Sequence, residues 1–131
     1  MANGTEAMSN MPLLCRSLGL EGRPDILKRI DGHTSTFGNY AYEIIEIKSA
    51  RKLRQHHILQ AALYYRILSE VQSVETGSFH LINGDMEISR YFAADYEADL
   101  DLAIEGLRQV LTGAPVPAIY RSAEWPWEGY V

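Results

Sequence analysis

The strongest constraint on the fold lies between positions 40 and 48, where the sequence reads YAYEIIEIK. Aromatic and β-branched residues dominate this segment, which favours a strand. Side chains of a strand alternate between its two faces, so Glu46 and Lys48 lie on the face that also carries Tyr42 and Ile44. The pattern therefore predicts a strand over 40–48 with one otherwise apolar face that ends in an acidic and a basic group.

Around this strand, the hydrophobic pattern predicts three further strands and two long helices. A polar run over 31–36 is expected to end the first strand, and Asn-Gly-Asp at 83–85 predicts a turn between the last two strands. The segment over 13–20 fits either a short amphipathic helix or a packed arm. The expected order is a strand over 25–30, a strand over 40–48, a helix over 54–72, strands over 79–82 and 87–92, and a helix that Asp95 caps and that runs to about Leu111.

The length and composition fit a single compact domain. The chain has 131 residues, of which 47% are hydrophobic, so one core of useful size can form. We expect an N-terminal arm or short helix over 1–21, a folded core over 22–113 and a C-terminal tail over 114–131. The tail carries a Trp-Pro-Trp motif at 125–127, which either folds back on the domain or docks on a partner.

Charge and cysteine content narrow the function classes. The formal net charge is −5, which argues against a protein whose whole surface binds nucleic acid, because phosphate binding needs basic residues. Cys15 is the only cysteine, so a disulfide framework and a cysteine-rich metal cluster are excluded within the chain. No apolar run approaches the ~20 residues of a membrane helix and no secretory signal is visible. We therefore expect no membrane partner and a cytoplasmic location.

A local basic strip nevertheless follows the predicted central strand. Arg51, Lys52, Arg54 and His57 are candidate nucleic-acid-binding residues, because they come directly after Lys48 and open the first long helix. The alternative is the solvated start of a helix, which is the commoner role of a run of charges.

Three side chains carry the chemistry that the sequence predicts: Asp25, Glu46 and Lys48. The first two strands are joined by a short loop, so they are expected to pair antiparallel and to bring these groups together. The two carboxylates, with the backbone carbonyl of Ile47, are oxygen ligands that Mg²⁺ accepts. Such an ion lowers the pKa of a coordinated water, and Lys48 would orient that water or stabilise charge in the transition state. Each feature alone also fits an ordinary role, with Asp25 in a turn and the Glu46–Lys48 pair as an ion pair on a strand.

The order of these motifs resembles the signature of the PD-(D/E)XK nuclease superfamily, in which Pro-Asp is followed by Glu-x-Lys at the end of a strand and then by a helix. Gln60 and Tyr64 are four residues apart and share one face of that helix. Such a Gln-xxx-Tyr pair is the mark of the RecB-like branch, although a pair on a helix surface has the same spacing. The segments that look like one bacterial group of predicted RecB-family nucleases are GRPDIL at 22–27, YEIIEIK at 42–48 and LQAALY at 59–64.

The resemblance covers roughly 22–96 and implies a fold and an activity. The implied fold is α/β, a restriction-endonuclease-like core with a central mixed four-stranded sheet flanked by helices on both sides. The implied activity is hydrolysis of DNA phosphodiester bonds with Mg²⁺ or Mn²⁺, in DNA repair or defence. By the same resemblance Asp25 and Glu46 bind the metal, Lys48 is catalytic, and Gln60 and Tyr64 support the site or the DNA strand. A larger helicase or nuclease assembly is a further expected partner.

Two departures from the family pattern leave other functions open. No histidine precedes His33, so the upstream metal ligand that RecB-like enzymes usually carry is not evident. The tail has no cysteine, so no iron–sulfur cluster is expected. The alternatives to an active nuclease are a catalytically impaired DNA-binding or scaffold module with the same fold, and a protein-interaction subunit whose carboxylates are incidental.

Overall fold

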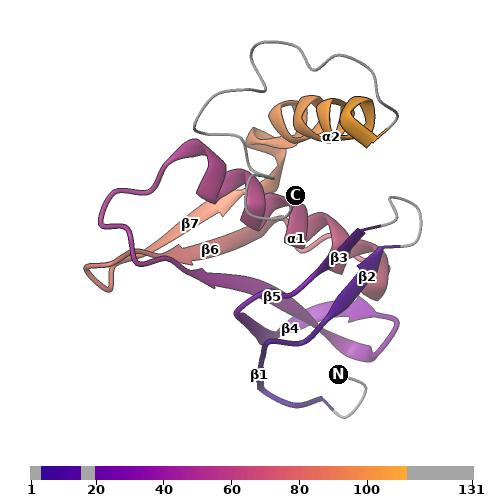
Figure 1. Cartoon of the computed structure of the whole chain (residues 1–131). Helices are drawn as coiled ribbons and strands as arrows, with labels where there is room; N and C mark the ends of the chain where they lie inside the picture. The colour runs from indigo at the N-terminus through magenta and orange to yellow at the C-terminus, as the bar shows by residue number, and fades with distance from the viewer. Residues whose placement is uncertain (1–3, 16–19, 112–131) are drawn as a thin grey trace.

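The computed structural model describes residues 4–15 and 20–111, and Figure 1 shows their arrangement. The tail over 114–131, with its Trp-Pro-Trp motif, lies outside the described residues. The elements are β1 (Ala7–Ser9), β2 (Leu13–Cys15), β3 (Leu20–Gly22), β4 (Ile26–Ser35), β5 (Gly38–Ile47), α1 (Gln55–Gln72), β6 (Ser78–Ile82), β7 (Ile88–Phe92), the 3-10 helix η1 (Ala93–Asp95) and α2 (Glu97–Leu111).

The described elements form an α/β fold around a mixed sheet of five strands in the order β1-β4-β5-β6-β7. The sequence predicted four strands; the fifth is β1, which pairs antiparallel with the edge of β4. Within this sheet β5 and β6 are parallel, because α1 carries the chain back between them, and the other neighbours are antiparallel. The ends of β5 and β6 and the starts of β4 and β7 therefore meet at one edge of the sheet.

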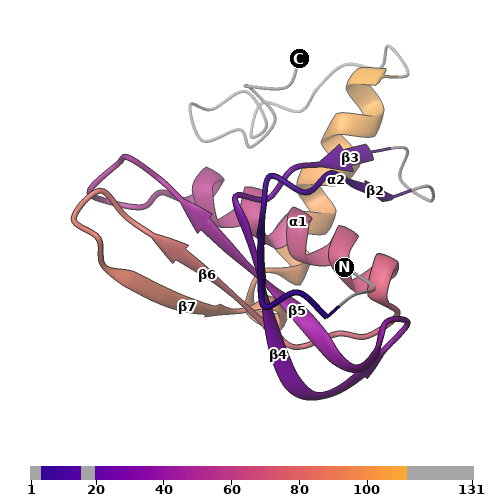
Figure 2. The same ribbon diagram turned by 90° about the horizontal axis from the view of Figure 1, so that it is seen from below.

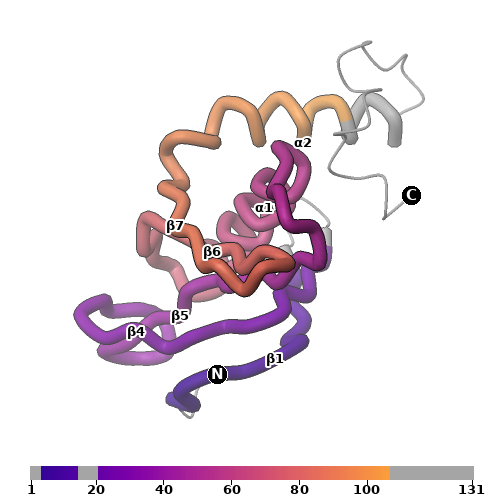
Figure 3. The backbone as a smooth tube through the Cα atoms, turned by 90° about the vertical axis from the view of Figure 1, so that its left-hand side faces the viewer, coloured from indigo at the N-terminus to yellow at the C-terminus, as the bar shows by residue number. Residues whose placement is uncertain are grey.

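Helix α1 lies against one face of the sheet, and α2 packs on the far side of α1 (Figures 2 and 3). The expectation of helices on both sides is wrong for the described residues, because both helices lie on the same side. The reason lies in α1, which is apolar around most of its circumference and so needs cover on two sides. The opposite face of the sheet exposes Ile47, Ile88 and Phe92.

The core forms between the sheet and α1. The strands contribute Leu27, Tyr42, Ile44, Phe79 and Leu81, which are fully buried, and α1 contributes Ala61, Ile67 and Leu68. The side chain of Gln72, the last residue of α1, is 1% exposed and binds the backbone of Tyr42 with both its amide atoms. These two bonds satisfy the backbone of β5 at Tyr42, which lies before the residues of β5 that pair with β6.

Several predicted boundaries are confirmed and others are corrected. The helix over 54–72, the strands over 79–82 and 87–92 and the turn at 83–85 are found within one residue of their expected limits. The first strand does not end before the polar run at 31–36 but continues to Ser35, with a register shift after Asp31. The hydroxyl of Ser35 donates to the Tyr40 carbonyl and accepts from the Phe37 amide, so the turn forms there instead.

The ends of the chain differ from expectation in two further places. The segment over 13–20 is not a helix in its described residues, because β2 and β3 form a two-stranded antiparallel hairpin that packs on α1 through Leu13. Asp95 does not open the last helix either. It lies in η1, and α2 begins at Glu97, where the amide of Leu100 donates to the carbonyl of Tyr96.

Candidate functional site

The centre of the site is Glu46, the second-to-last residue of β5. Its side chain is directed to the face that α1 covers, and the residue is 3% exposed. A buried carboxylate needs polar partners. Its Oε1 accepts a hydrogen bond of 2.8 Å from the backbone amide of Asp25, just before β4.

Asp25 and Glu46 hold each other in place across the two strands. Oδ2 of Asp25 accepts a 2.8 Å hydrogen bond from the backbone amide of Ile47, so each carboxylate binds an amide of the other strand. The register that pairs Ile26 with Ile45 makes this exchange possible. The structure thus brings together the two acidic residues that the sequence singled out.

Lys48 extends this cluster towards α1. Its Nζ lies 3.8 Å from Oε2 of Glu46 and donates to Oε1 of Gln60. Nε2 of Gln60 in turn lies 3.5 Å from the hydroxyl of Tyr64. The Gln-xxx-Tyr pair is therefore not a surface pair, because it connects the ammonium group of Lys48 with a tyrosine that is 4% exposed.

Gly22 is a further residue of the site that the sequence did not single out. A Cβ atom at this position would lie 2.7 Å from Cδ1 of Tyr64 and 2.9 Å from its Cε1, which is closer than side-chain atoms pack. The absence of a side chain thus lets β3 lie directly against the ring of Tyr64. The signal in the sequence was a glycine three residues before Asp25, within the GRPD segment.

The electrostatics of the site are dominated by the burial of Glu46. Burial, together with the nearby Asp25 carboxylate, raises the pKa of Glu46 from 4.5 to about 7, although the Asp25 amide and Lys48 act in the opposite direction. At this pKa, ionising the carboxyl inside the folded protein costs free energy, and a positive charge beside it lowers that cost. Burial, His56, Lys48 and Arg54 lower the pKa of His57, so His57 lies within electrostatic reach of Lys48.

The basic strip follows Lys48 on the same edge of the sheet. Arg51, Lys52 and Arg54 are exposed, and Arg54 precedes α1 as its N-cap. The backbone amide of Arg54 donates to Nδ1 of His57 at 2.9 Å, which sets the first turn of the helix. No acidic residue lies in that turn. The positive end of the helix and the charges of Arg51, Lys52 and Arg54 therefore reinforce each other.

The donor set at the site fits a hard divalent ion only in part. Asp25 and Glu46 supply carboxylate oxygens. The carbonyl of Ile47 lies on the same side of β5 as the Ile47 amide, which donates to Asp25. Among residues 4–15 and 20–111 no group of three or more His, Cys, Asp or Glu side chains could hold a metal. Waters and the substrate would have to complete the coordination, as they commonly do for Mg²⁺.

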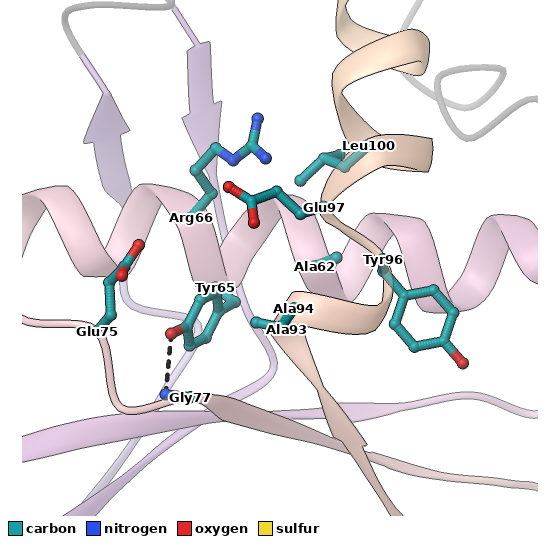
Figure 4. A pocket seen from close by; sticks show the side chains of 10 residues that line it. All are labelled: Ala62, Tyr65, Arg66, Glu75, Gly77, Ala93, Ala94, Tyr96, Glu97 and Leu100. Carbon is teal, nitrogen blue, oxygen red and sulfur yellow. Dashed lines mark hydrogen bonds between the residues drawn. The ribbon is translucent and has the colours of Figure 1, made fainter.

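A hollow lies away from this site, between α1, η1 and α2 (Figure 4). This cavity of about 280 Å³ contains none of the residues that the sequence marked as functional. Its wall includes Tyr65, whose hydroxyl accepts a hydrogen bond from the Gly77 amide, and Arg66, which forms an ion pair of 2.6 Å with Asp101.

The fold and the site together define an α/β domain with two carboxylates and a lysine at the carboxyl edge of its mixed sheet. No protein-family model matches the chain, and no curated protein sequence matches it. In the part of the chain that the structure describes, no helix has the length and apolar character needed to cross a membrane.

Proposed function

We propose that this chain is a DNA nuclease that depends on Mg²⁺ or Mn²⁺, with a restriction-endonuclease-like core of the RecB-like PD-(D/E)XK kind. The observation that carries the proposal is the exchange of hydrogen bonds between Asp25 and Glu46, with Lys48 beside them. Three charged groups with different roles in phosphodiester hydrolysis thereby share one small space at a sheet edge.

The carboxylates of Asp25 and Glu46 and the carbonyl of Ile47 would hold the ion. When bound, the ion lowers the pKa of a coordinated water and offsets negative charge on the phosphate. Because the pKa of Glu46 is about 7, protons compete with the ion for this carboxylate near neutral pH. Metal binding at this site is therefore expected to strengthen as the pH rises from 6 to 8.

Lys48 supplies the positive charge that the reaction needs next to the carboxylates. Its ammonium group would donate to the phosphate oxygen on which charge builds as water attacks phosphorus and the bond to the leaving sugar oxygen breaks. Gln60 fixes the direction of that ammonium through its Oε1, and Tyr64 contacts the other end of the Gln60 amide. These two residues act by orienting Lys48.

The basic strip supports DNA as the substrate. Arg51, Lys52 and Arg54 form a positive surface next to the carboxylates, although the chain as a whole is acidic. His57, whose pKa is lowered, lies beside them as a hydrogen-bonding group. A local positive patch on a negative protein directs a polyanion to that place. A larger helicase or nuclease assembly remains a proposed partner.

The deciding experiment is a nuclease assay on labelled single- and double-stranded DNA with Mg²⁺, Mn²⁺ or EDTA. We expect cleavage only with the metals, and a loss of at least ~100-fold in each of Asp25→Ala, Glu46→Ala and Lys48→Ala. Asp31→Ala, a change to an exposed carboxylate further along β4, is the matched control and should cleave like the unchanged protein. Cleavage that survives all three site substitutions would reject the proposal.

One observation favours a second candidate function. The pair Asp25 and Glu46 has no third His, Cys, Asp or Glu ligand within the described residues. A DNA-binding or scaffold module that has lost catalysis would keep the basic strip and tolerate this deficit. Metal-independent DNA binding without cleavage in the same assay would support this second function.

A further inference from the structure

The turn between β6 and β7 contacts the segment that follows Lys48 far more closely than a surface turn requires. The amide of Gly84 donates to the Ala50 carbonyl at 2.8 Å. A Cβ atom on Gly84 would lie 2.2 Å from the carbonyl oxygen of Ser49, and the three atoms nearest to it all belong to the backbone. Glycine is therefore the residue that permits this approach of two backbones.

Asn83 is the residue that joins the two segments. Its Nδ2 donates to the carbonyl of Arg51 and to Oε1 of Glu87, both at 3.0 Å. Its Oδ1 accepts from the amides of Asp85, at 3.0 Å, and Glu87, at 2.9 Å. An asparagine side chain has two N–H donors and two acceptor sites, so every one of them is used here.

The contact also includes charge. Nε of Arg51 lies 3.3 Å from Oδ1 of Asp85. Asn83 thus binds the carbonyl of Arg51, and Asp85 of the same turn binds its guanidinium. The side chain of Arg51 is 85% exposed, so this ion pair leaves most of the guanidinium open to a ligand.

We propose that the β6–β7 turn, residues 83–87, is a brace that presets the basic strip for the DNA backbone, with Asn83 as the positioning residue. This inference rests on the proposed function. The strip begins at Arg51, three residues after Lys48, and the brace starts immediately after Ile82, whose carbonyl accepts a hydrogen bond of 2.8 Å from the Lys48 amide. The brace therefore fixes Arg51, the first residue of the strip, relative to the carboxylates, and DNA binds without first ordering that residue.

An exposed turn of this kind contributes little to global stability, because it buries little apolar surface. Its hydrogen bonds have water as a ready substitute when one partner is removed. Substitutions in the brace should therefore leave the fold intact while they loosen the strip. If the turn served only to stabilise the fold, the same substitutions would lower the free energy of unfolding and leave DNA binding by the folded protein unchanged.

The test measures binding and cleavage of a fluorescein-labelled single-stranded DNA oligonucleotide by Asn83→Ala and Gly84→Ala. Neither substitution changes the charge of the protein. We expect Kd in EDTA, and KM with Mg²⁺, to rise about threefold to tenfold, because the strip must then be ordered on binding. The kcat value of Asn83→Ala should change by less than about twofold, since both carboxylates and Lys48 keep their contacts. Gly84→Ala displaces the Ser49 backbone next to Lys48, so only its Kd in EDTA bears on the brace. The slope of log Kd against log salt should also become shallower.

Two further variants make the result specific. Asn39→Ala, at the exposed start of β5 on the opposite edge of the sheet, is the matched control and should bind like the unchanged protein. Asn83→Asp keeps an acceptor for the two amides of the turn but has no donor for the Arg51 carbonyl, so it should bind DNA at least as weakly as Asn83→Ala, with its added negative charge contributing at low salt. Denaturant midpoints of all variants report whether the fold is kept.

The outcomes separate the two proposals. If the unchanged protein is an active nuclease and Asn83→Ala has the same Kd and KM, the brace is overturned and the nuclease proposal stands. DNA binding without metal-dependent cleavage overturns the nuclease, and the brace is then judged by Kd alone. Unchanged protein that does not bind DNA overturns both. A fall in the denaturant midpoint that accounts for the whole defect of Asn83→Ala also overturns the brace.

Discussion

Replacing Glu46 by glutamine tests the electrostatics of the site without any assay of activity. The carboxyl is almost fully buried, and its pKa in the folded protein is about 7 against an ordinary value of 4.5. A carboxyl with a raised pKa destabilises the folded state when it ionises, because the unfolded chain gives up the proton more readily. Stability of the metal-free protein therefore falls as the pH rises from 4.5 through 7.

The size of the effect follows from the two pKa values. Each pH unit between them is worth about 1.4 kcal/mol, so the rise from 4.5 to about 7 corresponds to about 3 kcal/mol at pH 8. Glutamine keeps an oxygen that accepts from the Asp25 amide but loses the ion pair with Lys48. We expect Glu46→Gln to be more stable than the unchanged protein by about 1 to 3 kcal/mol at pH 8, and equally stable below pH 4.5.

Denaturant unfolding in EDTA at pH 4.5, 6 and 8 measures this difference. Glu43→Gln is the control, since it removes one negative charge from the opposite face of the same strand. A Glu46→Gln protein that is less stable at pH 8, or whose difference from the unchanged protein does not grow with pH, would refute the reasoning. The same variant should lose nuclease activity, so stability and function would change in opposite directions.

Three other predictions concern the surroundings of the site and the metal. Gln72→Leu should destabilise the protein by about 2 to 4 kcal/mol in denaturant unfolding, because the buried amide and carbonyl of Tyr42 lose their partners; an unchanged midpoint would contradict this. Gly22→Ala should cost about 1 to 3 kcal/mol, because the new Cβ overlaps the ring of Tyr64, whereas Gly32→Ala, with nothing within 4 Å of its Cβ, tests the backbone strain alone. Mn²⁺ should raise the melting temperature more at pH 8 than at pH 6, since protons compete for Glu46 at the lower pH; a shift that persists in Asp25→Ala would show that the ion binds elsewhere.

The elements that were predicted correctly are those that local periodicity defines. The helix over 54–72 carries enough apolar residues to be recognised from spacing alone. The strand predicted over 40–48 is found as β5 over Gly38–Ile47, so it begins two residues earlier and ends just before Lys48. The errors occur where a distant partner decides. Strand β1 exists because it pairs with β4, and the end of β4 depends on the hydroxyl of Ser35.

The residues of the candidate site divide in the same way. Asp25, Glu46 and Lys48 were singled out by residue type and spacing, and Gln60 and Tyr64 by the resemblance to RecB-like nucleases; the structure brings all five into one chain of contacts. The contributions of Asn83 and Gly84 to the strip were not visible, because the sequence marked them only as a turn. Spacing along the chain does not reveal which distant segment a turn contacts.

The sequence by itself determined the residue types of the site, the strand that carries two of them and the helix that carries two more, because these depend on side-chain chemistry and on periods of a few residues. Only the tertiary structure decided that Asp25 and Glu46 exchange hydrogen bonds, that Glu46 is buried deeply enough to raise its pKa, and that both helices lie on one side of the sheet. Register, burial and layer order arise from contacts between segments far apart in the chain, and local patterns do not encode them.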